Sequence, residues 1–385
     1  MRKKLKILMI AATPIPGNRG TPSRILEMSE ALKDLGHDVR IVAYHLKSRE
    51  YNGPVEVYRI PNIKTYRKLG PGPSIQKFLV CDPLLYLKVK QLLKTFKPDI
   101  IHGHSFEGAL VGIMLKRNFE GKLVYDAHST LIGEMPHYNF LSPKIILNAI
   151  DKYVPQKSDV IISVSEEIKS FLINLGISEK KIYVIPTGVN INQFNFSDGE
   201  NFKKKYNLKN NSIVTYTGTL AKFQGTEYFV RSIPLLLKKI PDLTAVIVGN
   251  DPDDIYKNLI RELYIEKNVL LLENTSFSDV PEILAASDVV VSPRIECPGI
   301  PQKITNYMAA GKAIVSFEGS AKLIVDNENG LIVENGNIAK FAEAIIKIIR
   351  DADLKNKLGK NSYLTIKDEY EWSILAKKIE QIYFN

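Results

Sequence analysis

The segment Ser292–Lys303 holds the densest group of residues that could do chemistry. Its sequence, SPRIECPGIPQK, combines the cations Arg294 and Lys303 with the carboxylate of Glu296 and three prolines. The cations can neutralise phosphate, and the carboxylate can accept hydrogen bonds from sugar hydroxyls. The backbone amides of Gly299–Ile300 lie where they can reach a diphosphate. A plain surface loop does not need this combination, so we predict a ligand site here.

A glycine-containing turn follows a predicted strand in each half of the chain and leads into a predicted helix. The first turn is Gly17–Thr21 (GNRGT), and the second is Gly218–Gly225 (GTLAKFQG). Such turns present backbone N–H groups and the positive end of a helix to an anion. Neither contains a full G-x-G-x-x-G with a trailing acid, which argues against a dinucleotide enzyme. One such turn in each half suits a ligand whose diphosphate is held between two domains.

Histidines follow two predicted strands of the first half, in the segments His102-Gly103-His104 and Asp126-Ala127-His128. Residues just beyond the carboxyl ends of parallel strands line the crevice where ligands bind. A histidine there can donate a hydrogen bond to a substrate hydroxyl, and we expect this role for His128. We expect His102 to be buried with its hydrogen bonds satisfied. We expect no metal at His102 and His104, on the view that their spacing points the two side chains to opposite faces of the strand.

The elements that must position these residues follow a regular alternation. Short β-branched apolar runs alternate with longer amphipathic stretches, which is typical of a doubly wound α/β protein. A helix is predicted over Ser23–Leu35, with Gly36 as its C-cap. The predicted strands are Ile7–Ala11, Val39–Ala43, Val55–Ile60, Ile100–His102, Leu123–Tyr125, Val160–Val164, Ile182–Ile185, Ser212–Thr217, Thr244–Val248, Val269–Leu272, Val289–Ser292, Ala313–Ser316 and Gly330–Val333.

The length of 385 residues suits two domains of under 200 residues each. We place the boundary near Pro186–Asn190, with an N-terminal domain over 1–188 and a C-terminal domain over 189–367. The segment 368–385 has a helical pattern. It can be the last helix of the second domain.

Several classes of protein are disfavoured by the composition. The chain contains no run of about 18 uncharged apolar residues, so no membrane span is predicted. The basic N-terminus leads into an apolar run of only about eight residues, which we interpret as a strand rather than a signal peptide. We therefore expect a cytoplasmic protein. Cys81 and Cys297 are too few for a disulfide framework and match no metal-site spacing.

The net charge of +10 comes from the first hundred residues, which hold 19 Lys and Arg against 8 Asp and Glu. Within 64–97, apolar residues are interleaved with the basic residues Lys64, Arg67, Lys68, Lys77, Lys88, Lys90, Lys94 and Lys97. This pattern fits an ordinary solvated helix face. It also fits a surface that binds anionic lipid, as in a peripheral protein of the inner membrane face, or an anionic acceptor. Nucleic acid is a weaker alternative, because no recognised binding motif accompanies the basic stretch.

These segments, in this order, resemble the retaining GT-B glycosyltransferases of family four over nearly the whole chain. The motifs that carry the resemblance are Gly17–Thr21, Leu35–Val39, Pro98–His104, Tyr125–Ser129, Ile185–Asn190, Tyr216–Leu220 and Pro301–Lys312. The resemblance implies two Rossmann-like domains facing each other across a cleft, with the C-terminal helix crossing back to the first. It implies a UDP- or GDP-sugar on the second domain, an acceptor on the first, no cofactor, and a metal-independent reaction that retains anomeric configuration.

The resemblance also assigns roles to residues. His128 corresponds to the histidine beside the donor sugar, and Gly20 to the loop residue that meets the phosphate. Catalytic roles are expected for His128, Glu296, Arg294 and Lys303. Donor contacts are expected at Gly20, Gly218, Thr219, Lys222, Gln224, Gly299, Ile300 and Asn306. Contacts to the acceptor or the cleft are expected at Arg19, Thr21, His104 and Asp126.

The chain departs from the family pattern at three of these positions. Thr219 and Gln224 stand where the family usually has an arginine and a lysine that bind the diphosphate. Asn306 stands at the second of two glutamates, which normally binds the ribose. Two missing cations in a desolvated site would cost several kcal/mol of transition-state stabilisation. We therefore expect Lys222, Arg294 and Lys303 to replace them.

Three other functions remain open at this point. A sugar-nucleotide epimerase or hydrolase on the same fold would turn over without an acceptor. A catalytically silent scaffold or sugar-nucleotide-binding partner would explain Thr219, Gln224 and Asn306. A sensor with a periplasmic-binding-like fold is disfavoured by the lack of a predicted signal peptide.

Overall fold

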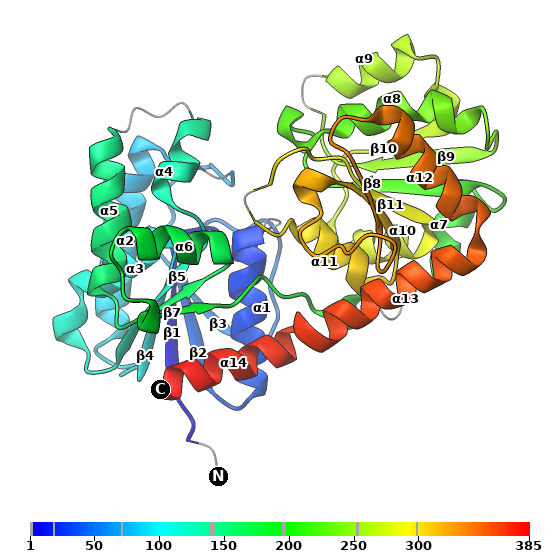
Figure 1. Ribbon diagram of the computed structural model, residues 1–385. Helices are drawn as coiled ribbons and strands as arrows, with labels where there is room; N and C mark the ends of the chain where they lie inside the picture. Colours follow the sequence, from blue (N-terminus) through cyan, green and yellow to red (C-terminus); the bar gives the residue numbers. More distant parts are fainter. Residues whose placement is uncertain are drawn as a thin grey trace. The chain divides into compact units, whose positions relative to one another are not determined.

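The structure is a computed structural model that describes residues 3–17, 20–70, 72–138, 143–194, 198–251, 254–297 and 299–385. It contains two compact units (Figure 1). The first unit comprises Met1–Gly188 and Trp372–Asn385, and the second comprises Val189–Glu371. Among the described residues, no helix combines the length and the apolar character that crossing a bilayer requires.

The first unit is built on a seven-stranded parallel sheet with the order β3-β2-β1-β4-β5-β6-β7. Its strands are β1 (Lys6–Ala11), β2 (Asp38–Ala43), β3 (Glu56–Arg59), β4 (Ile100–His104), β5 (Lys122–Ala127), β6 (Val160–Ser163) and β7 (Ile182–Val184). The inner strands are apolar on both faces, as expected for a parallel sheet covered by helices on both sides.

Helices cover the two faces of the first sheet according to the alternation of side chains along each strand. On one face, Ile7 and Met9 of β1 pack with α1 (Gly20–Asp34) and α14 (Trp372–Phe384). On the other, Leu8 and Ile10 pack with α2 (Asp82–Leu92) and α3 (Ser105–Met114). Beyond β5 lie α4 (Leu131–Glu134), α5 (Lys144–Lys157) and α6 (Glu166–Asn174).

The second unit is built on a six-stranded parallel sheet with the order β10-β9-β8-β11-β12-β13. Its strands are β8 (Ser212–Thr217), β9 (Leu243–Val248), β10 (Val269–Leu272), β11 (Val289–Ser292), β12 (Ala313–Phe317) and β13 (Leu331–Val333). The structure therefore has a strand at each of the thirteen predicted positions, with small differences at the ends.

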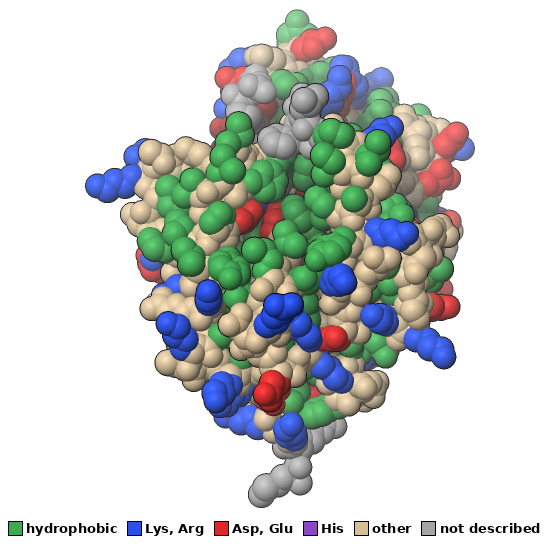
Figure 2. Space-filling view, turned by 90° about the vertical axis from the view of Figure 1, so that its left-hand side faces the viewer, with side chains coloured by type: hydrophobic (Ala, Val, Ile, Leu, Met, Phe, Trp, Pro, Cys, Tyr) green, Lys and Arg blue, Asp and Glu red, His purple; other side chains and the backbone are tan. Residues whose placement is uncertain are grey.

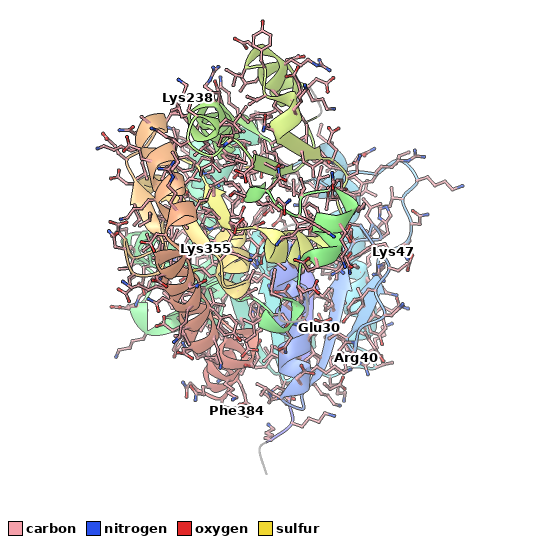
Figure 3. The ribbon with its side chains drawn as sticks, turned by 90° about the vertical axis from the view of Figure 1, so that its right-hand side faces the viewer. Glu30, Arg40, Lys47, Lys238, Lys355 and Phe384 are labelled. Carbon is pink, nitrogen blue, oxygen red and sulfur yellow. The ribbon has the colours of Figure 1, made fainter. Side chains whose placement is uncertain are left out.

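Helices also cover both faces of the second sheet. One face packs against α8 (Thr226–Leu237), α9 (Ile255–Glu262) and α12 (Ile338–Arg350). The other packs against α7 (Glu200–Lys205), α10 (Val280–Ala286), α11 (Gln302–Ala309) and α13 (Ala352–Glu369). Lys355 of α13 (Figure 3) forms an ion pair with Asp288, next to the start of β11, at 2.7 Å. This pair joins α13 to the segment before β11, and the buried Leu358 and Ile366 pack α13 against the rest of the unit.

The C-terminal helix α14 belongs to the core of the first unit. Trp372, Leu375 and Ile379 are buried in the cluster formed by β1, β2 and α1. The Trp372 indole N–H donates a hydrogen bond to Glu27 of α1 at 2.7 Å. Because α13 lies in the second unit, the chain passes from one unit to the other between Glu371 and Trp372.

Candidate functional site

Each sheet has one point at which the strand order reverses, and ligands of open α/β sheets bind beyond the carboxyl ends of the strands at such a point. In the first sheet this point lies between β1 and β4, and in the second between β8 and β11. The predicted residues His104 and Gly218 lie at the end of β4 and directly after β8, and Arg294 follows β11.

A buried ion pair lies at the centre of the first site. Arg24 of α1 donates hydrogen bonds to both carboxylate oxygens of Asp126, each at 3.1 Å, and both side chains are buried. Arg24 also donates to the carbonyl oxygens of Ile185 and Pro186. Burial by itself would raise the pKa of Asp126. The Arg24 guanidinium and the facing histidines outweigh burial and hold that pKa well below its usual value.

Two of the predicted histidines share the Asp126 carboxylate. The Nδ1 atom of His104 and the Nε2 atom of His128 lie 3.1 and 3.2 Å from Asp126 Oδ2. Burial lowers the pKa of His104 to about 3, so its ring is neutral and donates Nδ1–H to the carboxylate. If His128 donates Nε2–H to Asp126, its Nδ1 atom remains to accept a hydrogen bond from a ligand.

The expectation that His102 and His104 point to opposite faces is wrong, because residues two apart on a strand share a face. The strand β4 extends through His104, and the two rings stack with centroids 4.5 Å apart. His102, His104 and Asp126 place three potential metal-ligand atoms within 4.8 Å of one another. However, Arg24 already supplies the positive charge beside Asp126, so a metal ion there would face a guanidinium.

His102 is buried as expected, but only one of its ring nitrogens is hydrogen-bonded. Its Nδ1 atom lies 2.6 Å from the hydroxyl of Tyr383 of α14. Its Nε2 atom lies 3.7 Å from Asp126 Oδ2, beyond hydrogen-bond distance. The C-terminal helix thus contributes the Tyr383 hydroxyl to the group of side chains around Asp126.

A pocket of about 350 Å³ opens beside this group. The predicted residues Gly20, Thr21 and His104 line it, and Arg19 lies outside the described residues. The remaining lining comes from residues of segments 12–13, 22–25, 69–78, 105–107 and 129–135, and from Tyr125 and Asp151. Within it, Lys77 forms an ion pair with Glu107, and the two side chains are 15% and 9% exposed. Lys77 is therefore not part of the basic surface predicted over 64–97.

In the second unit, the amine of Lys303 lies against the turn after β8. It donates a hydrogen bond to the side-chain oxygen of Gln224 at 3.0 Å and lies 4.0 Å from the ring centroid of Tyr216. Gly218 has a φ of +142°, and a Cβ atom there would lie 3.0 Å from the Lys303 Nζ atom. Burial and then the charge of Arg294 lower the pKa of Lys303 to about 7.

Arg294 extends the same cationic group. Its guanidinium lies 4.9 Å from the ring centroid of Phe223, and its Nε atom donates to the backbone oxygen of Glu296 at 2.5 Å. Gly225 has a φ of +71°, and a Cβ atom there would lie 2.0 Å from the Pro293 carbonyl oxygen. Glycine at this position therefore allows the turn after β8 to pack against the loop after β11.

The structure brings some predicted donor residues together and leaves others apart. Gly218, Gln224 and Lys303 form one group, and Arg294 influences it by its charge. The side chains of Thr219, Lys222 and Glu296 are exposed, and Gly299 and Ile300 are partly buried. Asn306 lies within α11 with only 5% of its surface exposed. A ligand contact at Asn306 stays a prediction.

Sequence reasoning missed Arg24, Lys77, Glu107 and Tyr383. A signal existed for Arg24, because it lies four residues before Met28 and eight before Leu32, on the buried stripe of α1. A charged residue in a core stripe is rarely buried without a partner. No comparable signal exists for Tyr383, whose partner His102 is 281 residues away in the sequence.

Two family models match adjoining parts of the chain. The Glycosyltransferase Family 4 model matches residues 19–193, and the Glycosyl transferases group 1 model matches residues 198–365. The first match covers most of the first unit, and the second match lies within the second unit.

Several known proteins are similar to the chain over its full length. An uncharacterized glycosyltransferase of Methanocaldococcus jannaschii is 24% identical, with 99% of this chain and 98% of that protein covered. The UDP-Gal:alpha-D-GlcNAc-diphosphoundecaprenol alpha-1,3-galactosyltransferase of Escherichia coli is 26% identical, with 99% and 97% covered. The crystal structure of Anabaena Alr3699/HepE in complex with UDP has a TM-score of 0.77 at 18% identity, with 98% and 99% covered. From the two family models and the two Rossmann-like units, we conclude that the chain belongs to the group 1 glycosyltransferases and has their GT-B fold.

Proposed function

We propose that this glycosyltransferase moves a sugar from a UDP- or GDP-sugar to the hydroxyl of a lipid-linked or membrane-proximal acceptor. We further propose that it retains the configuration at the anomeric carbon and needs no metal ion. The observation that carries the proposal is the amine of Lys303 at the turn after β8, with Arg294 nearby. Among the described residues, the hydrogen-bond partners of both cations are uncharged oxygens, of the Gln224 side chain and the Glu296 backbone, so both charges are available to an anion.

The cations replace those that the family usually has at Thr219 and Gln224. Lys303 donates to the Gln224 side chain, so its amine stands beside the position where the family's lysine is attached. A diphosphate at this place would meet a lysine amine and the backbone N–H groups of the turn. Its negative charge would also draw a proton onto Lys303, because the pKa of that amine is only about 7 without a ligand.

The reaction exchanges one bond of the anomeric carbon for another. The bond to the diphosphate oxygen breaks, a bond to the acceptor oxygen forms on the same face, and the hydroxyl proton passes to the departing diphosphate. Positive charge develops on the sugar and negative charge on the leaving group. Arg294 and Lys303 stabilise the negative charge of the leaving group, which is the role that a metal ion has in other enzymes.

In the first unit, we propose His128 as the residue that contacts the donor sugar, as the family resemblance implies. Asp126 orients its ring through Nε2, and Arg24 keeps Asp126 ionised. The Nδ1 atom of His128 then accepts a hydrogen bond from a sugar hydroxyl. His128 is thus an orienting group whose own position depends on the buried Arg24–Asp126 pair.

The names of similar proteins support the choice of substrates. The Escherichia coli relative is named for a UDP-galactose donor and a diphosphoundecaprenol-linked acceptor. The Anabaena protein is described in complex with UDP and with UDP-glucose. We therefore place UDP-sugars first among the donors and polyprenyl-diphosphate-linked sugars first among the acceptors.

A thermal-shift screen against UDP-, GDP-, ADP- and TDP-sugars, with EDTA present, tests the donor. A ligand at one hundred times its Kd adds about 2.7 kcal/mol to the free energy of unfolding. Proton NMR of the product with the identified donor tests retention through the anomeric coupling. Binding of a sugar nucleotide without transfer to a broad panel of acceptors would instead support a catalytically silent binding protein. An inverted product would contradict retention.

A further inference from the structure

The pocket of the first unit is lined by both polar and apolar side chains. Gly20 and Thr21 of α1 line it together with His104 at the end of β4, so the pocket lies at the reversal point of the first sheet. The apolar side chains Leu69, Phe78, Leu131 and Met135 also line it. A pocket of about 350 Å³ accommodates one or two sugar rings.

The charged groups inside the pocket are mostly carboxylates. Lys77 neutralises the Glu107 carboxylate. Burial by itself would lower the pKa of Lys77, but the negative charge of Glu107 outweighs burial and raises that pKa. Asp151 accepts hydrogen bonds from the backbone N–H groups of Leu131 and Ile132 at 2.9 and 3.0 Å. The pocket therefore holds more negative than positive charge.

Glu134 is a carboxylate of the pocket whose side-chain partners are uncharged hydroxyl groups. It accepts hydrogen bonds from the hydroxyls of Ser129 and Tyr138, the latter at 3.1 Å. A carboxylate has about four acceptor positions, so two remain for the hydroxyls of a ligand. Glu134 forms no ion pair among the described residues, and Lys77 of the same lining is already paired with Glu107. A phosphate or uronate beside Glu134 would therefore be repelled.

The outer surface next to the pocket is apolar and basic. Ile75, Leu79 and Ile145 expose 69%, 71% and 84% of their surface. The other exposed apolar residues of this surface are Leu69, Val80, Leu87, Ile146 and Tyr153. The exposed basic residues of segments 64–90 and 144–157 are Lys64, Arg67, Lys90, Lys144, Lys152 and Lys157. Figure 2 shows hydrophobic side chains gathered on this side of the molecule, with Lys and Arg side chains beside them. Lys97 lies at the opposite ends of the strands, where it lines a separate pocket with Lys3 and Tyr383.

The carboxylates of α2 and α5 do not offset this positive charge at the surface. Asp82 accepts a hydrogen bond from the buried Tyr44, and Asp151 is held by backbone amides. Both carboxylates therefore point inward, and the outer faces of the two helices present lysines between apolar side chains. This combination is complementary to an anionic lipid surface, where apolar side chains enter the headgroup region and lysines meet phosphates.

We propose that the pocket binds the uncharged, hydroxyl-rich head of an amphipathic acceptor while the apolar and basic surface around Leu79 and Ile145 rests on anionic lipid. The inference rests on the proposed function and adds the chemical class of the acceptor head. Glu134 selects hydroxyls and rejects anions inside the pocket. The phosphate of a lipid-linked acceptor stays outside the pocket, near exposed basic residues such as Arg67 and Lys144.

Binding of alkyl glycosides tests the pocket without requiring any transfer reaction. Isothermal titration compares dodecyl glucoside with its 6-phosphate for the wild type, Glu134→Gln and the matched exposed control Glu120→Gln. We expect Glu134→Gln to weaken binding of the neutral head about 10- to 100-fold, because hydrogen bonds to a charged group are lost. The same change should reduce the preference against the phosphate.

The outcomes separate the two proposals. Equal binding of both glycosides, or no effect of Glu134→Gln in a variant whose thermal melting matches the wild type, overturns the pocket assignment and leaves the proposed function untouched. If Glu134→Gln has a lower Tm than the wild type, Ser129→Ala is used in its place, because this change removes a hydrogen-bond partner of the Glu134 carboxylate. Head-specific binding without transfer from any nucleotide sugar would support the pocket and contradict the proposed function.

Sedimentation with vesicles tests the lipid surface. The wild type should bind vesicles with 30% phosphatidylglycerol at low salt and release them at high salt, and it should bind phosphatidylcholine vesicles at least tenfold more weakly. Leu79→Glu with Ile145→Glu should reduce binding at least tenfold. Ile255→Glu, an exposed apolar residue of the second unit, is the matched control. Equal loss with the control, or no preference for anionic vesicles, would overturn the surface assignment.

Discussion

The reversal points of the two sheets occupy equivalent places in their folds and have opposite chemistry. In the first unit, the cations Arg24 and Lys77 are each paired with a buried carboxylate. In the second, Lys303 and Arg294 form no ion pair among the described residues. The cations of the first site are thus neutralised by its own carboxylates and acceptor oxygens remain there, whereas the second site retains positive charge.

This difference shows that the parallel sheet determines where the binding site lies, whereas the side chains at that point determine which ligand can bind. Both sheets end their central strands at a turn that leads into a helix. The cations of the first site are paired with carboxylates of the same site, so an anionic ligand would gain little electrostatic stabilisation there. In the second site, an anion would relieve the unpaired charge of two cations. Hydroxyl groups suit the first site, and a diphosphate suits the second.

The largest expected effect concerns the internal pairing of the first site. Arg24→Met leaves Asp126 buried without its cation, so we expect the free energy of unfolding to fall by about 3–5 kcal/mol. Lys47→Met is the control, because Lys47 (Figure 3) pairs with Glu50 in an exposed ion pair of the same unit. That change should cost about 1 kcal/mol or less. Urea denaturation measures both. Similar losses in the two variants would show that the Arg24 pair is not a special feature of the first site.

The next effect concerns the unpaired cations of the second site. Lys303→Ala and Arg294→Ala should each reduce kcat by about 10²- to 10³-fold, because each removes charge stabilisation from the departing diphosphate. Lys238→Ala changes an exposed lysine next to the end of α8 (Figure 3) and should leave kcat unchanged. Steady-state kinetics with the donor found in the binding screen measures these rates. Rates close to the wild type in both site variants would place the diphosphate elsewhere.

The smallest effect is the pH dependence of donor binding. Without ligand, Lys303 carries its proton below about pH 7 and loses it above. Since a diphosphate binds the protonated amine, the Kd for UDP should rise by up to about tenfold per pH unit above pH 7. Titration calorimetry between pH 6 and 9 measures this slope. Lys303→Met should bind UDP weakly, with a flatter profile in this range. Identical slopes for both proteins would assign the titration to another group.

The strands were predictable because both sheets are covered on both faces. Their strands are short runs of Val, Ile and Leu separated by amphipathic helices, so all thirteen positions could be predicted without tertiary information. The segment around Arg294 and Lys303 was also recognisable, because its residues lie within a dozen positions of one another. What the sequence pattern did not reveal was that Lys303 lies against Gln224, which is 79 residues away.

The sequence by itself thus determined the alternation of strands and helices and the composition of the local cationic segment. The tertiary structure decided which charges were available to a ligand. Arg24 meets Asp126 across 102 residues, and Lys77 meets Glu107 across 30. The shared face of His102 and His104, by contrast, follows from their spacing of two residues on a strand and needed no tertiary information. A side chain's charge is known from its type, but whether it is free or neutralised depends on partners that only folding brings near it.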